Sequence, residues 1–350
     1  MQVDELMSEL ERQAVISQEK ILGDLNGCLL NNITFDQVDF SDARFGDCDL
    51  SAVIFINCNL SGQDLAEIRS SRITLNHCEL DGCHFSNGAV SGLNALDCNF
   101  SQANFDAAKI VDCNFISCDF SEAVFDRTEL SQSRFSTCSF DRAAFDAICW
   151  QNFALYEVSF ASSVFRPKTI TRGVMVACDF SGQNWASAQI SQSSFNQGIF
   201  HRVNFSKGTL KSCHFTQSHF SDVTFFGSTL DGCFFNQGTL ANCNFGSASA
   251  LESNFDDIKA SGVDFSRAAM QRGRFCRSSL EDVKFIDAEL EYSDFSGAWV
   301  NDVDYTGARL RFANFHAVQG EYELSAPQQS VVLGSDDAKL EAEALHAAAH

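Results

Sequence analysis

The sequence predicts an all-β solenoid, in which an extended backbone winds through stacked coils with four sides. Apolar residues occupy every fifth position from Phe35 to Phe315 except Ser70, without an insertion, and 30 of the 34 phenylalanines fall on this register. A period of five does not fit a helix of 3.6 residues per turn, but it fits short extended segments that each end in a corner. The core candidates are Phe35, Phe40, Phe45, Leu50, Phe105, Phe120, Phe125, Phe205, Phe215, Phe220, Phe225, Phe265 and Phe315.

A second inward position precedes each of these apolar residues by two. It holds a small or β-branched residue, as at Ala43, Val53 and Ala103. Residues two apart in an extended backbone point to the same side, so both side chains face the inside of the coil. The other three positions of each repeat are mostly Ser, Asp, Asn, Gln or Gly and are expected to face solvent.

The number of sides follows from similarity at a spacing of twenty residues. The column from Leu50 to Leu310 in steps of twenty has no Phe among its 14 members, whereas the other 43 register positions hold 30. A three-sided coil would mix these columns, so four repeats form one coil. The register then predicts about 14 coils, stacked over roughly 70 Å at about 4.8 Å per coil.

These repeats resemble those of the pentapeptide repeat family, which have a central Leu or Phe, a small residue two before it and often Asp or Asn directly before it. The resemblance covers about residues 31–318 and implies a right-handed quadrilateral β-helix. The pattern is weak at residues 63–75 and 89–96, and large residues replace small ones at Phe153 and Lys168. We expect local irregularity at these places within an otherwise regular coil. The family pattern stands at Val38-Asp39-Phe40, Cys48-Asp49-Leu50, Ala103-Asn104-Phe105, Cys118-Asp119-Phe120, Cys178-Asp179-Phe180, Val203-Asn204-Phe205 and Ala313-Asn314-Phe315.

We divide the chain into an N-terminal capping helix (1–26), the β-helix (27–318) and a C-terminal strand and helix segment (319–350), because an open stack needs caps at both ends. Residues 3–22 place apolar side chains on one face of a predicted helix, which serves as a cap or as a dimer or partner helix.

At the other end, Pro327 is expected to break the chain and residues 331–333 to add a strand. A helix capped by Ser335 is expected to run to about Ala349. The resemblance also implies a homodimer through the terminal segments, since C-terminal segments of this family often mediate dimerisation.

Thirteen of the 15 cysteines occupy the small inward position and are interpreted as reduced, buried packing residues. Parallel side chains about 4.8 Å apart are too distant for an unstrained disulfide, whose Cβ atoms lie about 3.8 Å apart. No C-x-x-C motif occurs, so we expect no metal site. Cys149 and Cys276 lie off the register and are expected to be more exposed. A ladder of thiols is predicted at Cys58, Cys78, Cys98, Cys118, Cys138 and Cys178.

Charge is distributed unevenly along the chain. The formal net charge of −22 argues against direct binding to nucleic acid or to anionic membranes. Residues 31–160 carry a net charge of −12, whereas residues 161–220 carry +5. These charges are interpreted either as a solvated surface or as a partner-binding one. The candidate partner-binding residues are Arg166, Lys168, Arg172, Arg202, Lys207, Lys211, Asp36, Asp39, Asp42, Asp47 and Asp49.

No motif for catalysis is found. The sequence has no phosphate-binding loop, zinc-protease motif or nucleophile elbow, and a core filled with Phe leaves no cavity for a substrate or cofactor. We therefore expect a protein that is not an enzyme and needs no cofactor. There is no run of about 18 apolar residues, and the start carries acids where a secretory signal carries bases. This predicts a cytoplasmic protein. The resemblance implies a bacterial one, for which export by a system that needs no signal peptide stays open.

The leading functional hypothesis is a rigid scaffold or adaptor for other proteins, because solenoid faces offer many contacts at little ordering cost. The resemblance adds a role in bacterial secretion, as an accessory protein or effector. It also implies an alternative, an acidic DNA mimic that binds DNA gyrase or topoisomerase IV through the stretch from Asp36 to Asp49. A 70 Å duplex carries roughly 40 charges, whereas residues 31–318 carry a net charge of only −13.

Overall fold

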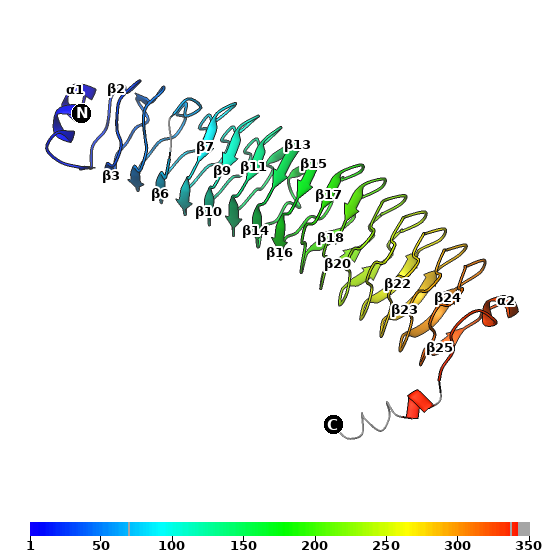
Figure 1. Ribbon diagram of the computed structural model, residues 1–350. Coiled ribbons are helices and arrows are strands. Elements are labelled where there is room, and N and C mark those ends of the chain that lie inside the picture. Colours follow the sequence, from blue (N-terminus) through cyan, green and yellow to red (C-terminus); the bar gives the residue numbers. More distant parts are fainter. Residues whose placement is uncertain (69–70, 337, 342–350) are drawn as a thin grey trace. The chain divides into compact units, whose positions relative to one another are not determined.

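The computed structural model describes residues 1–68, 71–336 and 338–341 and consists of short parallel strands joined by turns (Figure 1). The strands pair with segments about twenty residues away, as in Asn114 with Arg134, so four repeats make one coil. The predicted right-handed quadrilateral β-helix is confirmed, with about 15 turns. The chain forms two compact units, Met1–Asp179 and Phe180–His350.

Each side of the coil ends in a residue with left-handed backbone. The residue two after the inward Phe has a positive φ in most repeats, for example 56° at Gln37, 50° at Asn57 and 57° at Arg127. This conformation ends the extended segment and redirects the chain, so that the next inward pair starts a new side. The period of five is therefore two inward residues, their neighbours and one corner residue.

The first unit contains a nine-stranded parallel sheet, a five-stranded sheet and the pair β2–β4. In Figure 1 the strands β3, β6, β10, β14 and β16 of the nine-stranded sheet follow one another along one side. The nine strands are β1 (Val15–Ser17), β3 (Thr34–Asp36), β5 (Ile54–Ile56), β6 (Thr74–Asn76), β8 (Asn94–Leu96), β10 (Asn114–Ile116), β12 (Arg134–Ser136), β14 (Ala154–Tyr156) and β16 (Val174–Val176). The other strands are β2 (Gly23–Asp24), β4 (Ala43–Arg44), β7 (Ala89–Ser91), β9 (Lys109–Val111), β11 (Glu129–Ser131), β13 (Ala144–Gln151) and β15 (Val164–Thr171).

The second unit contains a seven-stranded parallel sheet, the pair β17–β19 and the short helix α2 (Ala326–Gln329). The seven strands are β18 (Ile199–His201), β20 (His219–Ser221), β21 (Thr239–Ala241), β22 (Lys259–Asp264), β23 (Ser279–Lys284), β24 (Trp299–Asp304) and β25 (Gln319–Tyr322). The pair consists of β17 (Gln189–Ser191) and β19 (Thr209–Lys211).

The core of each unit is a set of phenylalanine columns. All thirteen core candidates are at most 3% exposed. Rings one coil apart stack nearly parallel, with centroids 4.8 Å apart for both Phe105–Phe125 and Phe205–Phe225. This spacing equals the distance between hydrogen-bonded strands, so one geometry satisfies both the backbone ladder and the aromatic contacts.

The N-terminal helix is shorter than predicted. Helix α1 (Val3–Leu10) ends at Leu10, and β1 already pairs with β3, so the coil begins well before residue 27. The expected helix to residue 22 is therefore wrong. Ile16 and Ile21 are buried in the core with the same spacing of five. The pattern is hidden in the sequence because Leu25 follows Ile21 after four residues instead of five.

The C-terminal segment closes the last coil. Leu333 pairs in parallel with Asn314, so residues 331–333 extend the sheet as predicted. Pro327 lies in the first turn of α2, where a missing N–H is tolerated. The expectation that Pro327 interrupts the secondary structure is therefore wrong. Asp336, and not Ser335, accepts a hydrogen bond from the amide of Lys339 (3.1 Å). The rest of the predicted helix to Ala349 lies outside the described residues.

The side chain of Gln328 forms hydrogen bonds to carbonyls of the last coil that the backbone of a following coil would otherwise form. It falls on the small inward register, one coil after Ala308, and its Nε2 donates to the carbonyls of Tyr305 (2.7 Å) and Ala308 (3.1 Å). Its Oε1 accepts from the amide and hydroxyl of Ser325, both at 2.9 Å. One side chain thus satisfies the open edge of the last coil and the first turn of α2.

The large residue at Phe153 is compensated one coil later. Phe153 is buried at an inward position that elsewhere holds a small side chain. The residue twenty positions on is Gly173, and a Cβ there would lie only 2.6 Å from Cζ of Phe153. The absent side chain of Gly173 therefore provides the space that the Phe153 ring occupies.

A bulge accommodates the charged side chain at Lys168. In the pairing of β13 with β15, Asp146 faces Arg166, Ile148 faces Pro167 and Cys149 faces Thr169, so the register shifts by one residue at Ala147 and is restored at Lys168. Pro167 is buried in the inward position, and Lys168 is exposed. A shift of one residue turns a side chain to the opposite face of a strand, so the lysine reaches water without a break in the coil.

The repeat pattern is weak in the sequence at residues 63–75 and 89–96. In the structure, residues 89–96 form the regular strands β7 and β8. In residues 63–75, Asp64 pairs with His84 and Leu75 is buried in β6, whereas residues 69 and 70 lie outside the described part of the chain.

All 15 cysteines are free thiols, and 13 are buried. In the ladder, the amide of Cys78 donates to Sγ of Cys98 at 3.4 Å. Burial raises the pKa of Cys83, Cys178 and Cys243 to about 12, because the thiolate would lose its hydration inside the core. These thiols are therefore protonated and unreactive at neutral pH.

We predict that Gly173→Ala lowers the free energy of unfolding by about 1–3 kcal/mol, because the new methyl group overlaps the Phe153 ring. The same substitution in a Phe153→Val background should cost much less, since the ring is absent. Urea unfolding of the four proteins in this double-mutant cycle measures the difference. Equal costs in both backgrounds would contradict the predicted contact.

We predict that Gln328→Ala costs about 1–3 kcal/mol, because the carbonyl of Ala308 loses its donor and that of Tyr305 keeps only the bond from the amide of Ala308. Hydrogen exchange should speed up at the amides around Ala308. Gln329→Ala is the control, since Gln329 donates only to the carbonyl of Leu324 within its own segment. If both variants raised exchange equally, Gln328 would have no special role at the edge.

We predict that iodoacetamide at pH 8 modifies the half-buried Cys149 first and the half-buried Cys28 more slowly, because burial raises the pKa of the Cys28 thiol. The other 13 cysteines should react only after unfolding in urea. Mass spectrometry of the peptides gives the rate at each site. Fast labelling of Cys83 or Cys178 in the folded protein would rule out a closed core.

Candidate functional surfaces

Because the interior is filled, the outward side chains of the coil are the candidate functional residues. The first unit presents four sides, which we name by their strands or charge. The nine-stranded face carries β1 to β16 of the nine-stranded sheet, and the five-stranded face carries β7, β9, β11, β13 and β15. The acidic face comprises residues 38–42 and their equivalents at steps of twenty, and the fourth side begins with β2 and β4.

The structure separates the five predicted acidic contact residues. Asp36 lies in β3 on the nine-stranded face, and Asp47 follows β4 on the fourth side. Asp49 pairs with Leu29 on the side that continues as the five-stranded face. Only Asp39 and Asp42 share a face. Neighbours in sequence are spread around the coil because each repeat of five residues turns one corner.

Asp39 and Asp42 share a lysine from the preceding coil. Lys20 Nζ lies 3.0 Å from Oδ2 of Asp39 and 2.7 Å from Oδ2 of Asp42. Although burial opposes it, hydrogen bonding to Ser41 and the charge of Lys20 hold the pKa of Asp39 below its ordinary value. The N-terminal end of the acidic face is therefore partly neutralised.

The predicted basic residues are also distributed over different sides. In the first unit, Arg166 and Lys168 lie in β15, and the Arg172 guanidinium donates to Asn152 Oδ1 at 2.7 Å. In the second unit, Arg202 follows β18 and Lys211 lies in β19. Lys207 lies on the side between them. The structure therefore does not gather either set into one patch.

The acidic face has a regular charge pattern that becomes visible only at the spacing of twenty. Asp39, Asn59, Glu79, Asn99 and Asp119 pair in succession along it. The amide of Asn59 donates to Asp39 (3.1 Å), and that of Asn99 donates to Glu79 (2.7 Å). Alternating amides thus separate the carboxylates by two coils, about 9.6 Å. From residue 38 to 179 the face holds eight acids and one base, Arg142, a net charge of −7.

The nine-stranded face is different, because branched aliphatic side chains point outward from it. Ile54, Leu96 and Val174 are 39%, 41% and 39% exposed. Ile56, Ile116, Tyr156 and Val176 on the same sheet are half-buried. The sequence analysis missed this surface. A comparison of outward positions at steps of twenty contains the signal, since the equivalent positions of the acidic face carry only Asp, Glu, Asn, Ser and Ala.

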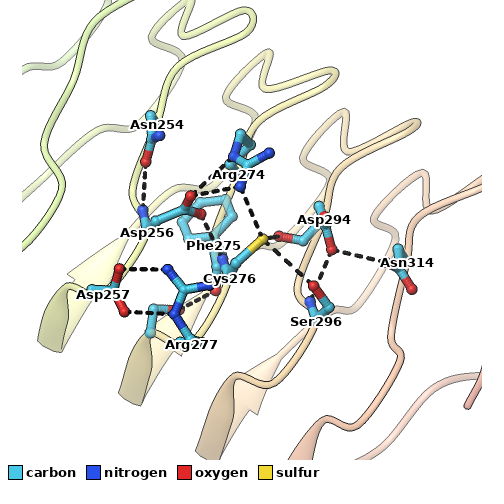
Figure 2. A network of polar contacts seen from close by, with 11 residues as sticks. Asn254, Asp256, Asp257, Arg274, Phe275, Cys276, Arg277, Asp294, Ser296 and Asn314 are labelled. Atoms are coloured by element: carbon cyan, nitrogen blue, oxygen red, sulfur yellow. Dashed lines mark hydrogen bonds and ion pairs between the residues drawn. The ribbon is translucent and has the colours of Figure 1, made fainter. Parts of the chain in front are cut away.

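A network of polar contacts crosses several coils of the second unit (Figure 2). Arg274 donates through Nε and Nη2 to Asp256 Oδ2, at 3.0 and 2.8 Å. The Asp256 side chain is only 9% exposed, and its other oxygen accepts from the amide of Cys276 at 2.8 Å. Arg277 pairs with Asp257 at 2.7 Å. Opposite charges one coil apart therefore stabilise the stack at this site.

Cys276 lies inside this network and is 3% exposed, so its expected exposure is wrong. The Arg274 guanidinium and the Ser296 hydroxyl donate to its sulfur at 3.6 and 3.5 Å. Burial raises the pKa of the Cys276 thiol to about 12. An off-register residue is covered here because Arg274 folds over it to reach Asp256 (Figure 2).

The described residues contain no group of three or more His, Cys, Asp or Glu side chains arranged to hold a metal ion. In the same part of the chain, no helix has the length and apolar character needed to cross a membrane.

Two family models match the chain. The model of the pentapeptide repeat region matches residues 96–165, and the model of eight pentapeptide repeats matches residues 24–55 and 199–237. The search of curated proteins found no match.

Several solved structures are similar over much of their length. HetL, a pentapeptide repeat protein involved in heterocyst differentiation regulation in the cyanobacterium Nostoc, is 14% identical, with 89% of this chain and 96% of HetL covered and a TM-score of 0.20. Full-length QnrB1, a plasmid-mediated fluoroquinolone resistance protein, is 16% identical, with 90% and 96% covered and a TM-score of 0.17. A mannuronic acid specific polysaccharide family 6 lyase from human gut microbiota is 9% identical, with 94% and 87% covered and a TM-score of 0.26.

At these TM-scores the solved structures carry no argument about activity or partners. The family rests instead on the chain itself: a register of five residues, parallel coils of four sides and the matches to both family models. The chain belongs to the pentapeptide repeat family.

Proposed function

We propose that the protein is a non-catalytic scaffold or adaptor that binds other proteins through the outward side chains of its coil. The observation that carries this proposal is the nine-stranded face, where Ile54, Leu96 and Val174 are held in water by a rigid sheet. Burying such side chains against a partner is favourable by about 25 cal/mol per Å². Since the core fixes the backbone, little conformational entropy is lost on binding.

The contents of the interior support a role without catalysis. Stacked rings fill it, as shown by Phe235 and Phe255 with centroids 4.9 Å apart. The reactive groups that the coil buries are thiols such as Cys178, whose pKa burial raises to about 12. Binding chemistry is therefore expected at the outer faces, and we extend the proposal to a cytoplasmic, secretion-associated adaptor as the leading biological setting.

The acidic face favours a second candidate, a DNA mimic that binds DNA gyrase or topoisomerase IV. Its carboxylates at Asp39, Glu79 and Asp119 repeat every two coils. A row of negative charges with a regular spacing is the feature that a DNA-binding surface would recognise. The contact would then follow the acidic face, and not the stretch from Asp36 to Asp49.

A homodimer through the terminal segments is part of the proposal. Residues 331–333 pair with the last coil on one side, and Leu333 is 51% exposed. An exposed strand at the end of a sheet is a ready site for another copy of the same strand.

The test uses the full chain as bait in lysate of its own host, under reducing conditions, with mass spectrometry of the retained proteins. We expect a specific protein to be retained in the presence of excess linear DNA. Retention of gyrase or topoisomerase IV subunits that DNA displaces would instead establish the mimic, and a Glu79→Gln/Asp119→Asn bait should then lose them. A folded bait that retains nothing beyond empty resin would contradict the scaffold proposal.

A further inference from the structure

We propose that the nine-stranded face of the first unit is a docking surface for an amphipathic helix of a partner protein, with basic side chains along one flank of that helix. This inference rests on the proposed scaffold function and adds the site and the chemistry of the partner.

The apolar centre of this surface is a column of outward side chains. The residues that directly follow the inward position on successive strands are, from β5 to β16, Ile56, Asn76, Leu96, Ile116, Ser136, Tyr156 and Val176. Five of these seven are apolar or aromatic. Leu96 pairs directly with Ile116 in β8 and β10, and Tyr156 pairs with Val176 in β14 and β16, whereas Asn76 and Ser136 interrupt the column. Outward apolar side chains gathered on one face in this way typically mark an interaction site.

The edge of this face toward the acidic face is negatively charged. Asp97 and Glu157 occupy corner positions of the nine-stranded face, and Glu79 and Asp119 lie directly beyond the corner. All four side chains are exposed. The apolar column is therefore bordered by acids on the side of the acidic face, which is complementary to an apolar stripe bordered by Lys or Arg.

The opposite edge differs, and this difference sets the orientation of the helix. The corner positions toward the five-stranded face include Arg72, Asp112 and Arg172, so this edge has no excess of acid. On the face itself, the Arg134 guanidinium lies 4.5 Å from the centroid of the Tyr156 ring. A partner helix with bases on both flanks would meet these arginines, so we assign the bases to one flank.

The dimensions of the column fit a helix. From Ile56 to Val176 the column crosses six coils, about 29 Å at 4.8 Å per coil. A helix rises 1.5 Å per residue, so about 19 residues cover this distance. A helix that lies across the strands can use side chains at i, i+3 and i+7 to contact successive coils.

The probe is a fluorescein-labelled peptide of 20 residues, with Leu and Ile along one helical stripe and Lys along one flank. A second peptide has the same stripe, with Glu in place of each Lys. We expect fluorescence anisotropy to show at least tenfold tighter binding of the basic peptide, with an affinity that falls as salt increases.

Two variants test the surface itself. Leu96→Arg/Ile116→Arg should weaken binding of the basic peptide at least tenfold, whereas Val111→Arg on the five-stranded face is the matched control and should bind as wild type does. Val111 is half-buried like Ile116, and Arg134 shows that an outward arginine is tolerated on a strand of this unit. Thermal unfolding of each variant confirms that the fold is kept. Glu79→Gln/Asp119→Asn should reduce the preference for the basic over the acidic peptide.

Equal affinity for both peptides would overturn the inference, and so would binding of the basic peptide that is insensitive to Leu96→Arg/Ile116→Arg. A third contradictory result would be a dimeric wild type that this double variant makes monomeric, because the face would then bind a second copy of the chain. The lysate experiment separates the inference from the scaffold proposal. If the Leu96→Arg/Ile116→Arg bait retains the same proteins as wild type, the proposed docking surface is wrong and the scaffold proposal stands. If wild type retains none, the scaffold proposal itself fails.

Discussion

The left-handed corner residue found in most repeats is the constraint on which the rest of the molecule depends. A non-glycine residue costs roughly 1–2 kcal/mol in this conformation, and corners such as Gln37 and Arg127 carry it repeatedly. Burial of one large apolar side chain, most often Phe, contributes about 1.5–3 kcal/mol per side, so each corner is held by the buried side chain beside it. The inward pair is therefore restricted in every repeat, while the three outward positions remain free to vary with function.

This division explains why charge clusters in the linear sequence do not form surface clusters. Asp36, Asp39 and Asp49 lie within fourteen residues of one another but on three different sides. Residues that share a surface are twenty positions apart, as Glu79 and Asn99 are. The same rule brings Leu96 beside Ile116 and Arg277 beside Asp257. Residues that form one surface of this chain are therefore spaced twenty apart, and a partner would contact one outward residue from each coil.

Irregular repeats are absorbed by the neighbouring coil, because each coil contacts chiefly the ones before and after it. The Phe153 ring fills the space left at Gly173, and the bulge at Lys168 brings Pro167 into the core. At the open end, Gln328 satisfies carbonyls that another coil would otherwise bond. Local compensation of this kind lets outward positions and single inward residues change without loss of the stack.

The sequence by itself determined the fold class, the four sides and the buried Phe and Cys columns, because a strict period directly reports which side chains face inward. It did not reveal the early start of the coil, because the spacing from Ile21 to Leu25 is four residues instead of five and the register of five therefore does not extend to Ile21. The burial of Cys276 and the closure of the last coil by Gln328 were decided only by the tertiary structure. Both depend on the contacts that a long side chain makes, Arg274 with Cys276 and Gln328 with the carbonyl of Tyr305. The candidate docking surface became apparent for the same reason: Leu96 and Ile116 lie side by side on one face because the coils stack, and not because of their order in the chain.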